Sequence, residues 1–136
     1  MRPRCTLRQI TGLTRIPMSL PIILLAGLFV GAGIMHWVAP APFVRIVPSF
    51  LPAAGVLVFI SGIAEVAGGV GILLVSTRRY AGWGLIALLV AVFPANIEML
   101  RDAIARHSPL WWQSALWLRL PLQPALIYWV WRATIR

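Results

Sequence analysis

Four long apolar segments alternate with short polar stretches along the chain. They cover residues 17–38, 53–75, 80–100 and 110–131, and each is close to the roughly 20 residues that an α-helix needs to cross the hydrocarbon core of a bilayer. We therefore expect four spanning helices at these positions. The fold class that this pattern predicts is all-α, a transmembrane four-helix bundle that occupies residues 17–132.

The residues before the first apolar segment are strongly basic. Residues 1–16 contain four arginines and no acidic residue. A basic stretch followed by an apolar one is typical both of a signal peptide and of a first spanning helix. The apolar run is longer than the usual core of a signal peptide, and the small residues after it, 39–42, include prolines that would follow the cleavage site. We therefore expect a retained helix after a basic cytoplasmic tail over residues 1–16.

Prolines dominate the stretch between the first two apolar segments, at positions 40, 42, 48 and 52. Proline lacks an amide hydrogen and its ring clashes with the preceding turn, so no regular helix is expected over residues 39–52. The other residues of this stretch are mostly apolar. The pattern predicts a loop that lies on the membrane surface and caps the bundle, with Arg45 in water.

Glu65 lies in the middle of the second apolar segment. A charge near the centre of a spanning helix costs about 3 kcal/mol on insertion scales, so the carboxylate should face polar partners inside the protein. Counted by helical rise from the outer ends of the segments, Arg119 lies at a depth from which its long side chain reaches Glu65. We therefore predict an ion pair between them, supported by Asn96 and Gln123, with His36 at the outer end of the same column.

This predicted buried polar site has two interpretations. In the first, Glu65 and Arg119 form a structural ion pair that fixes the order of the helices. In the second, the glutamate is a protonatable group beside a quinone or another small apolar ligand, and the arginine orients a carbonyl or an anion. Asn96 and Gln123 are most simply explained as hydrogen bonders between helices.

Small residues recur at helical spacing in the first two segments. They allow helix backbones to approach closely in a membrane. The residues that we expect to pack helices together are Gly27, Gly31, Gly33, Gly62, Gly68 and Gly69.

The composition excludes a soluble domain. Hydrophobic residues make up 60% of the chain and charged residues 11%, and the mean hydropathy is +0.88, outside the range of soluble proteins of this size. The formal net charge of +9 would suit a nucleic-acid-binding protein, but the arginines lie mainly at the ends of apolar segments. We therefore expect contact with a lipid bilayer and not with nucleic acid.

The arginines are distributed unevenly between the two sides of the predicted spans. Eight fall on the side that carries both chain termini, and three, Arg45, Arg101 and Arg106, fall on the other. Because arginine accumulates on the cytoplasmic side, we expect both termini in the cytoplasm of a multi-pass protein of the bacterial inner membrane.

Cysteine and metal chemistry receive little support. Cys5 is the single cysteine, so no disulfide forms within the chain. The two histidines, one cysteine and three carboxylates show no recognisable metal-ligand spacing, and no metal site is expected.

Four short stretches resemble those of the DoxX family of small bacterial membrane proteins. They are Leu-Phe-Val-Gly-Ala-Gly-Ile-Met-His at 28–36, Ser-Gly-x-x-Glu-x-x-Gly-Gly at 61–69, Phe-Pro-Ala-Asn-Ile at 93–97 and Arg-Leu-Pro-Leu-Gln at 119–123. The resemblance covers about residues 24–131 and implies a four-helix integral membrane protein. Some DoxX proteins are named as small subunits of a membrane thiosulfate:quinone oxidoreductase, and others are linked to oxidative-stress defence.

The resemblance and the polar site together predict an accessory or anchor subunit of a quinone-linked or oxidative-stress-related membrane oxidoreductase. Such a subunit would have no catalytic activity of its own, would bind a quinone and would require a redox protein as partner. One alternative is a small proton-coupled transporter or permeation module, which would need to form a homodimer through faces such as Gly27 and Gly31. Another is a purely structural membrane partner.

Overall fold

The computed structural model describes residues 19–136 and contains five α-helices in that range. They are α1 (Leu20–Val38), α2 (Pro40–Arg45), α3 (Ala54–Gly71), α4 (Arg78–Ala105) and α5 (Leu110–Thr134). No strand occurs among the described residues, so the all-α prediction is confirmed. The predicted basic tail over residues 1–16 and the first two residues of the first predicted helix lie outside the described residues.

Three of these helices, α1, α3 and α4, are long and apolar enough to cross a membrane, which indicates a membrane location. Helix α5 has 25 residues but also contains Gln113, Ser114, Arg119 and Gln123, and these polar side chains lower its mean hydropathy. The structure therefore supports three candidate spans, where the sequence pattern predicted four.

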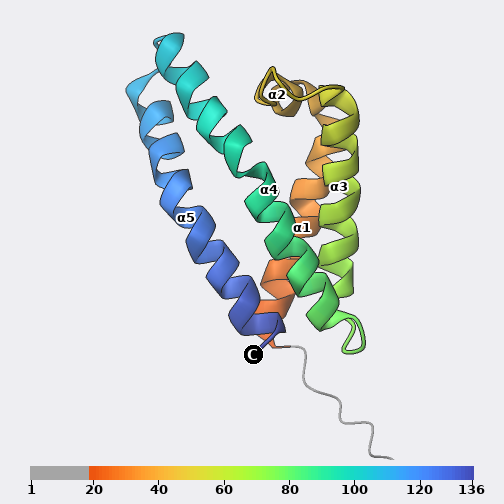
Figure 1. Cartoon of the computed structure of the whole chain (residues 1–136). Helices are drawn as coiled ribbons and strands as arrows, with labels where there is room; N and C mark the ends of the chain where they lie inside the picture. The colour runs from red at the N-terminus through yellow and green to blue at the C-terminus, as the bar shows by residue number, and fades with distance from the viewer. Residues whose placement is uncertain (1–18) are drawn as a thin grey trace, which may run out of the picture.

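The long helices form two antiparallel pairs. Helix α1 packs along α3, α4 packs along α5, and contacts between α3 and α4 join the pairs, while α1 and α5 approach each other at few positions. Figure 1 shows the two pairs close together at the end that holds the C-terminus and splayed apart at the end that holds α2. The main core lies where the pairs converge, around the fully buried Leu25, Ile72, Leu85 and Val130.

Two glycines bring α1 and α3 into close contact. A Cβ on Gly33 would lie 2.7 Å from the Gly62 carbonyl oxygen, and one on Gly62 would lie 2.9 Å from the Gly33 carbonyl oxygen. Gly69 is equally close to Val30 on α1, and Gly68 packs against Leu85 on α4. The packing role predicted for these four glycines therefore agrees with the structure.

Gly27 and Gly31 behave differently. Both are exposed, and a Cβ on either would have nothing within 4 Å. Within residues 19–136 these two glycines pack against no other helix, contrary to the expectation of a contact inside the bundle. Their role in contact with a second copy stays a prediction.

The proline-rich stretch contains a helix that the sequence analysis excluded. Residues 40–45 form α2, with proline at the start of the helix. The prediction for 39–52 was wrong at this point because the amides of a first helical turn have no acceptor within the helix, so a proline there loses no hydrogen bond. Figure 1 shows α2 at the splayed end of the molecule, beside the ends of α1 and α3.

The ends of α3 and α4 also differ from the predicted bounds. Helix α3 ends at Gly71 because Thr77 Oγ1 donates to the Gly71 carbonyl at 2.8 Å, and the buried Arg78 donates from Nε to the Ile72 carbonyl at 2.9 Å. Both bonds satisfy carbonyls that the helix leaves free. Helix α4 continues past residue 100 to Ala105, and Arg106 Nε donates to Asp102 Oδ1 at 2.6 Å.

We predict that Gly33→Ala lowers the free energy of unfolding of the purified protein in detergent by roughly 1 to 3 kcal/mol, and with it the melting temperature, because a methyl group there would force α1 and α3 apart. Gly31→Ala, two residues away on the open face of α1, is the matched control and should be neutral or slightly stabilising. Equal losses for both variants in a thermal-shift measurement would contradict the observed α1–α3 contact.

Candidate functional site

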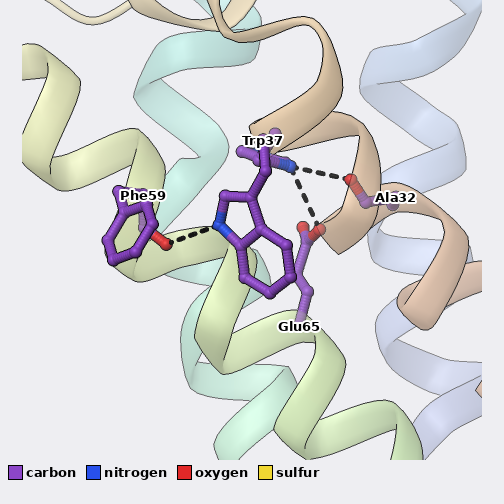
Figure 2. Close-up of polar contacts among 5 residues, drawn as sticks. Ala32, Trp37, Phe59 and Glu65 are labelled. Atoms are coloured by element: carbon purple, nitrogen blue, oxygen red, sulfur yellow. Dashed lines mark hydrogen bonds and ion pairs between the residues drawn. The ribbon is translucent and has the colours of Figure 1, made fainter.

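The close contact of α1 with α3 brings His36 to Glu65. The His36 Nδ1 atom lies 3.4 Å from Glu65 Oε2 and 2.8 Å from the Ala32 carbonyl oxygen, one helical turn earlier. Figure 2 draws both contacts as dashed lines that end on Ala32 and Glu65. Each of the two titratable side chains is only 12% exposed. The polar side chain that approaches this carboxyl group is therefore the imidazole of the neighbouring helix, and Glu65 Oε2 makes no hydrogen bond with the described residues.

The predicted ion pair between Glu65 and Arg119 does not form. Among the described residues, no carboxylate oxygen lies within 4.0 Å of the Arg119 guanidinium. Arg119 Nη1 instead donates to Met99 Sδ at 3.9 Å. The prediction failed because depth along the membrane does not fix lateral position. Helix α5 packs against α4, and that pair leans away from α3 at this level (Figure 1).

Aromatic side chains cover the His36–Glu65 pair, which the sequence analysis did not anticipate. Phe43 of α2 stacks on the His36 ring with centroids 4.1 Å apart and planes at 22°. The indole of Trp37 donates from Nε1 to the Phe59 carbonyl at 3.3 Å, as Figure 2 shows. The only sequence signal for this arrangement was a phenylalanine between prolines close to the end of the first helix. The predicted cap over the bundle thus includes a direct aromatic contact with a site residue.

Asn96 and Gln123 join α4 to α5. Asn96 Nδ2 donates to Gln123 Oε1, and Gln123 Nε2 donates to the Leu89 carbonyl oxygen. Both side chains are buried. These hydrogen bonds join α4 to α5 and do not support a Glu65–Arg119 pair.

Two cavities meet at these polar residues. The larger, about 330 Å³, lies at the splayed end under α2 and is lined mainly by apolar side chains together with His36. The smaller, about 220 Å³, lies between α1, α4 and α5 and includes Gln123 in its lining. The two share four lining residues, which are Glu65, Val92, Asn96 and Arg119. All five residues of the predicted polar site therefore line at least one cavity.

Several arginines in the described residues contact no acidic side chain, and Arg119 is the one among them that lines both cavities. Of the three acidic side chains in the sequence, Glu98 and Asp102 contact Arg101 and Arg106 on the surface, and Glu65 contacts His36. Among the described residues, Arg119 is thus a guanidinium beside an apolar cavity with no acidic side chain in contact. Such a group is suited to an acceptor oxygen of a ligand, either a carbonyl or an anion.

The same region offers few metal ligands. No group of three or more histidine, cysteine, aspartate or glutamate side chains gathers anywhere in residues 19–136. The chemistry available to this site is proton exchange at Glu65 and hydrogen-bond donation from Arg119 and Asn96.

We predict that His36 and Glu65 are energetically coupled. In a double-mutant cycle of His36→Phe, which keeps the stack on Phe43, and Glu65→Gln, the coupling energy should be about 0.5 to 3 kcal/mol by thermal or chemical unfolding in detergent. The parallel cycle of Glu65→Gln with Arg119→Gln should give a smaller value, since those side chains do not touch. A larger coupling energy in the second cycle would contradict this prediction and would indicate that Glu65 and Arg119 form an ion pair.

The family described as Domain of unknown function (DUF8561) matches residues 25–134 of the chain, which covers all of the described helices except the first five residues of α1. The chain belongs to this family. No curated protein and no solved structure matches the chain.

The family assignment corrects the resemblance to DoxX proteins, since no match to that family was found. The stretches that carried the resemblance have a general physical origin. Glycines, such as Gly33 and Gly62 here, are common wherever two membrane helices touch backbone to backbone. An acidic residue within a membrane helix, such as Glu65, requires a polar partner in any helical membrane protein. Such patterns recur in unrelated families.

Proposed function

We propose that this DUF8561 protein is an integral membrane protein that binds a small, largely apolar molecule through a carbonyl or anionic group, and that the molecule is a quinone. The observation that carries the proposal is that Arg119, whose side chain is exposed, lines the same apolar cavities as Glu65 and has no acidic partner in the described part of the chain. The volume of the larger cavity, about 330 Å³, falls in the range of small-molecule sites.

The chemistry of a quinone matches the groups around the cavity. One quinone oxygen accepts a hydrogen bond from Arg119, and Asn96 lines the same space. Reduction of a quinone to a quinol takes up two electrons and two protons. Glu65 would exchange a proton with the bound molecule, and His36 Nδ1, 3.4 Å from the carboxylate, would pass protons to or from it.

The electrons for that reduction would come from a redox protein in the same membrane. The chain would then act as an accessory or anchor subunit of a quinone-linked, or oxidative-stress-related, membrane oxidoreductase. The support for this role is the cavity and its polar residues alone, because the DoxX resemblance that also suggested it is not upheld.

Part of the same proposal is that α5 is a fourth span and that both termini are cytoplasmic, as in a bacterial inner-membrane protein. Four arginines, at positions 78, 79, 132 and 136, belong to the start of α4 and the end of the chain around the last turn of α5. Figure 1 shows that the helix pairs converge at this end. At the other end lie three arginines, Arg45, Arg101 and Arg106. This asymmetry favours a cytoplasmic location for the converged end.

We predict that a fluorescent protein fused after Arg136 is fluorescent in the cytoplasm, and that alkaline phosphatase fused there is inactive. The same pair of reporters inserted after Ser108, in the turn before α5, should give the opposite result, because one span separates the two sites. Reporters that behave alike at the two positions would mean that α5 does not cross the membrane.

A transport role receives less support. The two cavities meet at Glu65 and Arg119, as a proton-coupled path would require. The converged end is filled by fully buried side chains such as Leu25, Ile72 and Leu85, so one copy offers no path across. A permeation module would need a homodimer, for which Gly27 and Gly31 offer an open face on α1. A purely structural partner role would leave the cavities without a ligand.

We predict that the purified protein in neutral lipid nanodiscs binds a tail-less, water-soluble benzoquinone, measured by equilibrium dialysis against empty nanodiscs. Arg119→Gln should weaken binding by roughly 10- to 100-fold, the effect of losing a hydrogen bond from a charged donor. Arg101→Gln is the matched control, because Arg101 lies on the surface against Glu98 and lines neither cavity of the site. Identical affinity in all three proteins would contradict the proposal.

A further inference from the structure

The smaller cavity has no role in the binding of a headgroup alone. Apart from the residues that it shares with the larger cavity, it is lined by apolar side chains and Gln123. Leu28, Phe29 and Ala32 come from α1, and Leu122 and Leu126 come from α5. Because the shared residues include Glu65 and Arg119, this apolar space begins where the polar group of a bound ligand would lie.

The smaller cavity is bordered by helices that are only loosely joined. Helices α1 and α5 approach each other at few positions. Leu28 on one wall is 49% exposed, and Leu122 on the opposite wall is 54% exposed. In a membrane-embedded protein, exposed apolar surface at this level faces lipid, so the space between these side chains opens sideways toward the acyl chains.

The larger cavity, unlike the smaller one, has a cover on its outer side. It is covered by α2 and the segment that follows, through Phe43, Val47 and Leu51. That cover lies at the splayed end, where Phe43 is held on the His36 ring. An apolar molecule therefore meets a covered cavity from the aqueous side and an open one from the bilayer.

We infer that the ligand is an amphiphile with a long apolar tail, dissolved in the bilayer, which enters between α1 and α5 and leaves its tail in the smaller cavity. The inference rests on the proposed function, in which Arg119 and Glu65 hold the polar head. It adds the route of entry and restricts the ligand to tailed molecules of the membrane phase. A quinone with an alkyl or polyprenyl tail has this chemistry.

The tail contributes little to affinity, which determines the kind of experiment that tests the inference. Lipid tails are as apolar as leucine side chains, so moving a tail from the bilayer to this cavity removes no apolar surface from water. A longer tail should therefore not bind more tightly when concentration is expressed per lipid. The position of the tail and its steric exclusion are the informative readouts.

The experiment uses a decyl-tailed benzoquinone with a photoreactive diazirine near the end of the tail, added to the full-length protein in neutral nanodiscs. After irradiation, peptide mapping by mass spectrometry should find adducts on the α1 and α5 lining, at Leu28, Leu122 or Leu126. An excess of the unlabelled tailed quinone should suppress these adducts. Unlabelled decane, which lacks the head, should not.

A steric variant separates tail from head. Leu122→Trp adds bulk to the half-exposed wall of the smaller cavity and should lower the adduct yield about tenfold, while binding of the tail-less quinone stays unchanged. Leu118→Trp is the matched control, because Leu118 lies one turn away on α5, is 60% exposed and lines neither cavity. It should leave both measurements as in the wild type.

The outcomes distinguish this inference from the proposed function. If the tail-less quinone binds with dependence on Arg119 but the labelled tail reacts under α2, at Leu57 or Val58, the inference is overturned and the function stands. A wild-type adduct yield in Leu122→Trp has the same meaning. If neither quinone binds the wild-type protein, the proposed function fails, and the inference fails with it.

Discussion

A carboxyl group half-way along an apolar helix is the constraint on which the rest of this structure depends. Glu65 cannot face lipid without a large cost, so a polar partner must reach it from another helix. Gly33 and Gly62 let α1 and α3 touch backbone to backbone, and the same contact brings His36 Nδ1 to 3.4 Å from the carboxylate. Phe43, in the short helix that follows α1 directly, then stacks on the imidazole.

The two ends of the molecule differ in how their interiors are filled. Where the two helix pairs converge, fully buried aliphatic side chains such as Leu25 and Val130 fill the interior. Where they diverge, a smaller apolar cluster of Leu100, Ala103 and Leu116 packs α4 on α5. The hydrogen bonds of Asn96 and Gln123 also join these two helices, while space remains toward α1 and α3. Cavities persist there because the core at the other end already joins the pairs.

Arg119 is the residue that most restricts which ligands the site could bind. A structural ion pair would require an acidic side chain next to Arg119. The three acidic side chains of the sequence instead contact His36, Arg101 and Arg106. Its guanidinium is therefore free to bind an acceptor oxygen in a mostly apolar space. This feature supports a ligand-binding role independently of family, and it matters more since the family that the chain belongs to has no described function.

Hydrophobic length by itself determined the long helices of this protein, because about 20 apolar residues in a row have few other stable conformations in a membrane. The cost of burying charge likewise picked out Glu65, Arg119, Asn96, Gln123 and His36 as one site, and all five line the cavities. The partners within that set were decided only by tertiary structure. Sequence position gives the depth of a residue along its helix but not which helix lies beside it, because side-chain packing decides which helices are neighbours. Glycines allow α1 to pack closely on α3. Helix α5 packs on α4, and Arg119 therefore does not reach Glu65. Helix α2 was missed for a local reason, since prolines forbid a helix interior but fit a first turn.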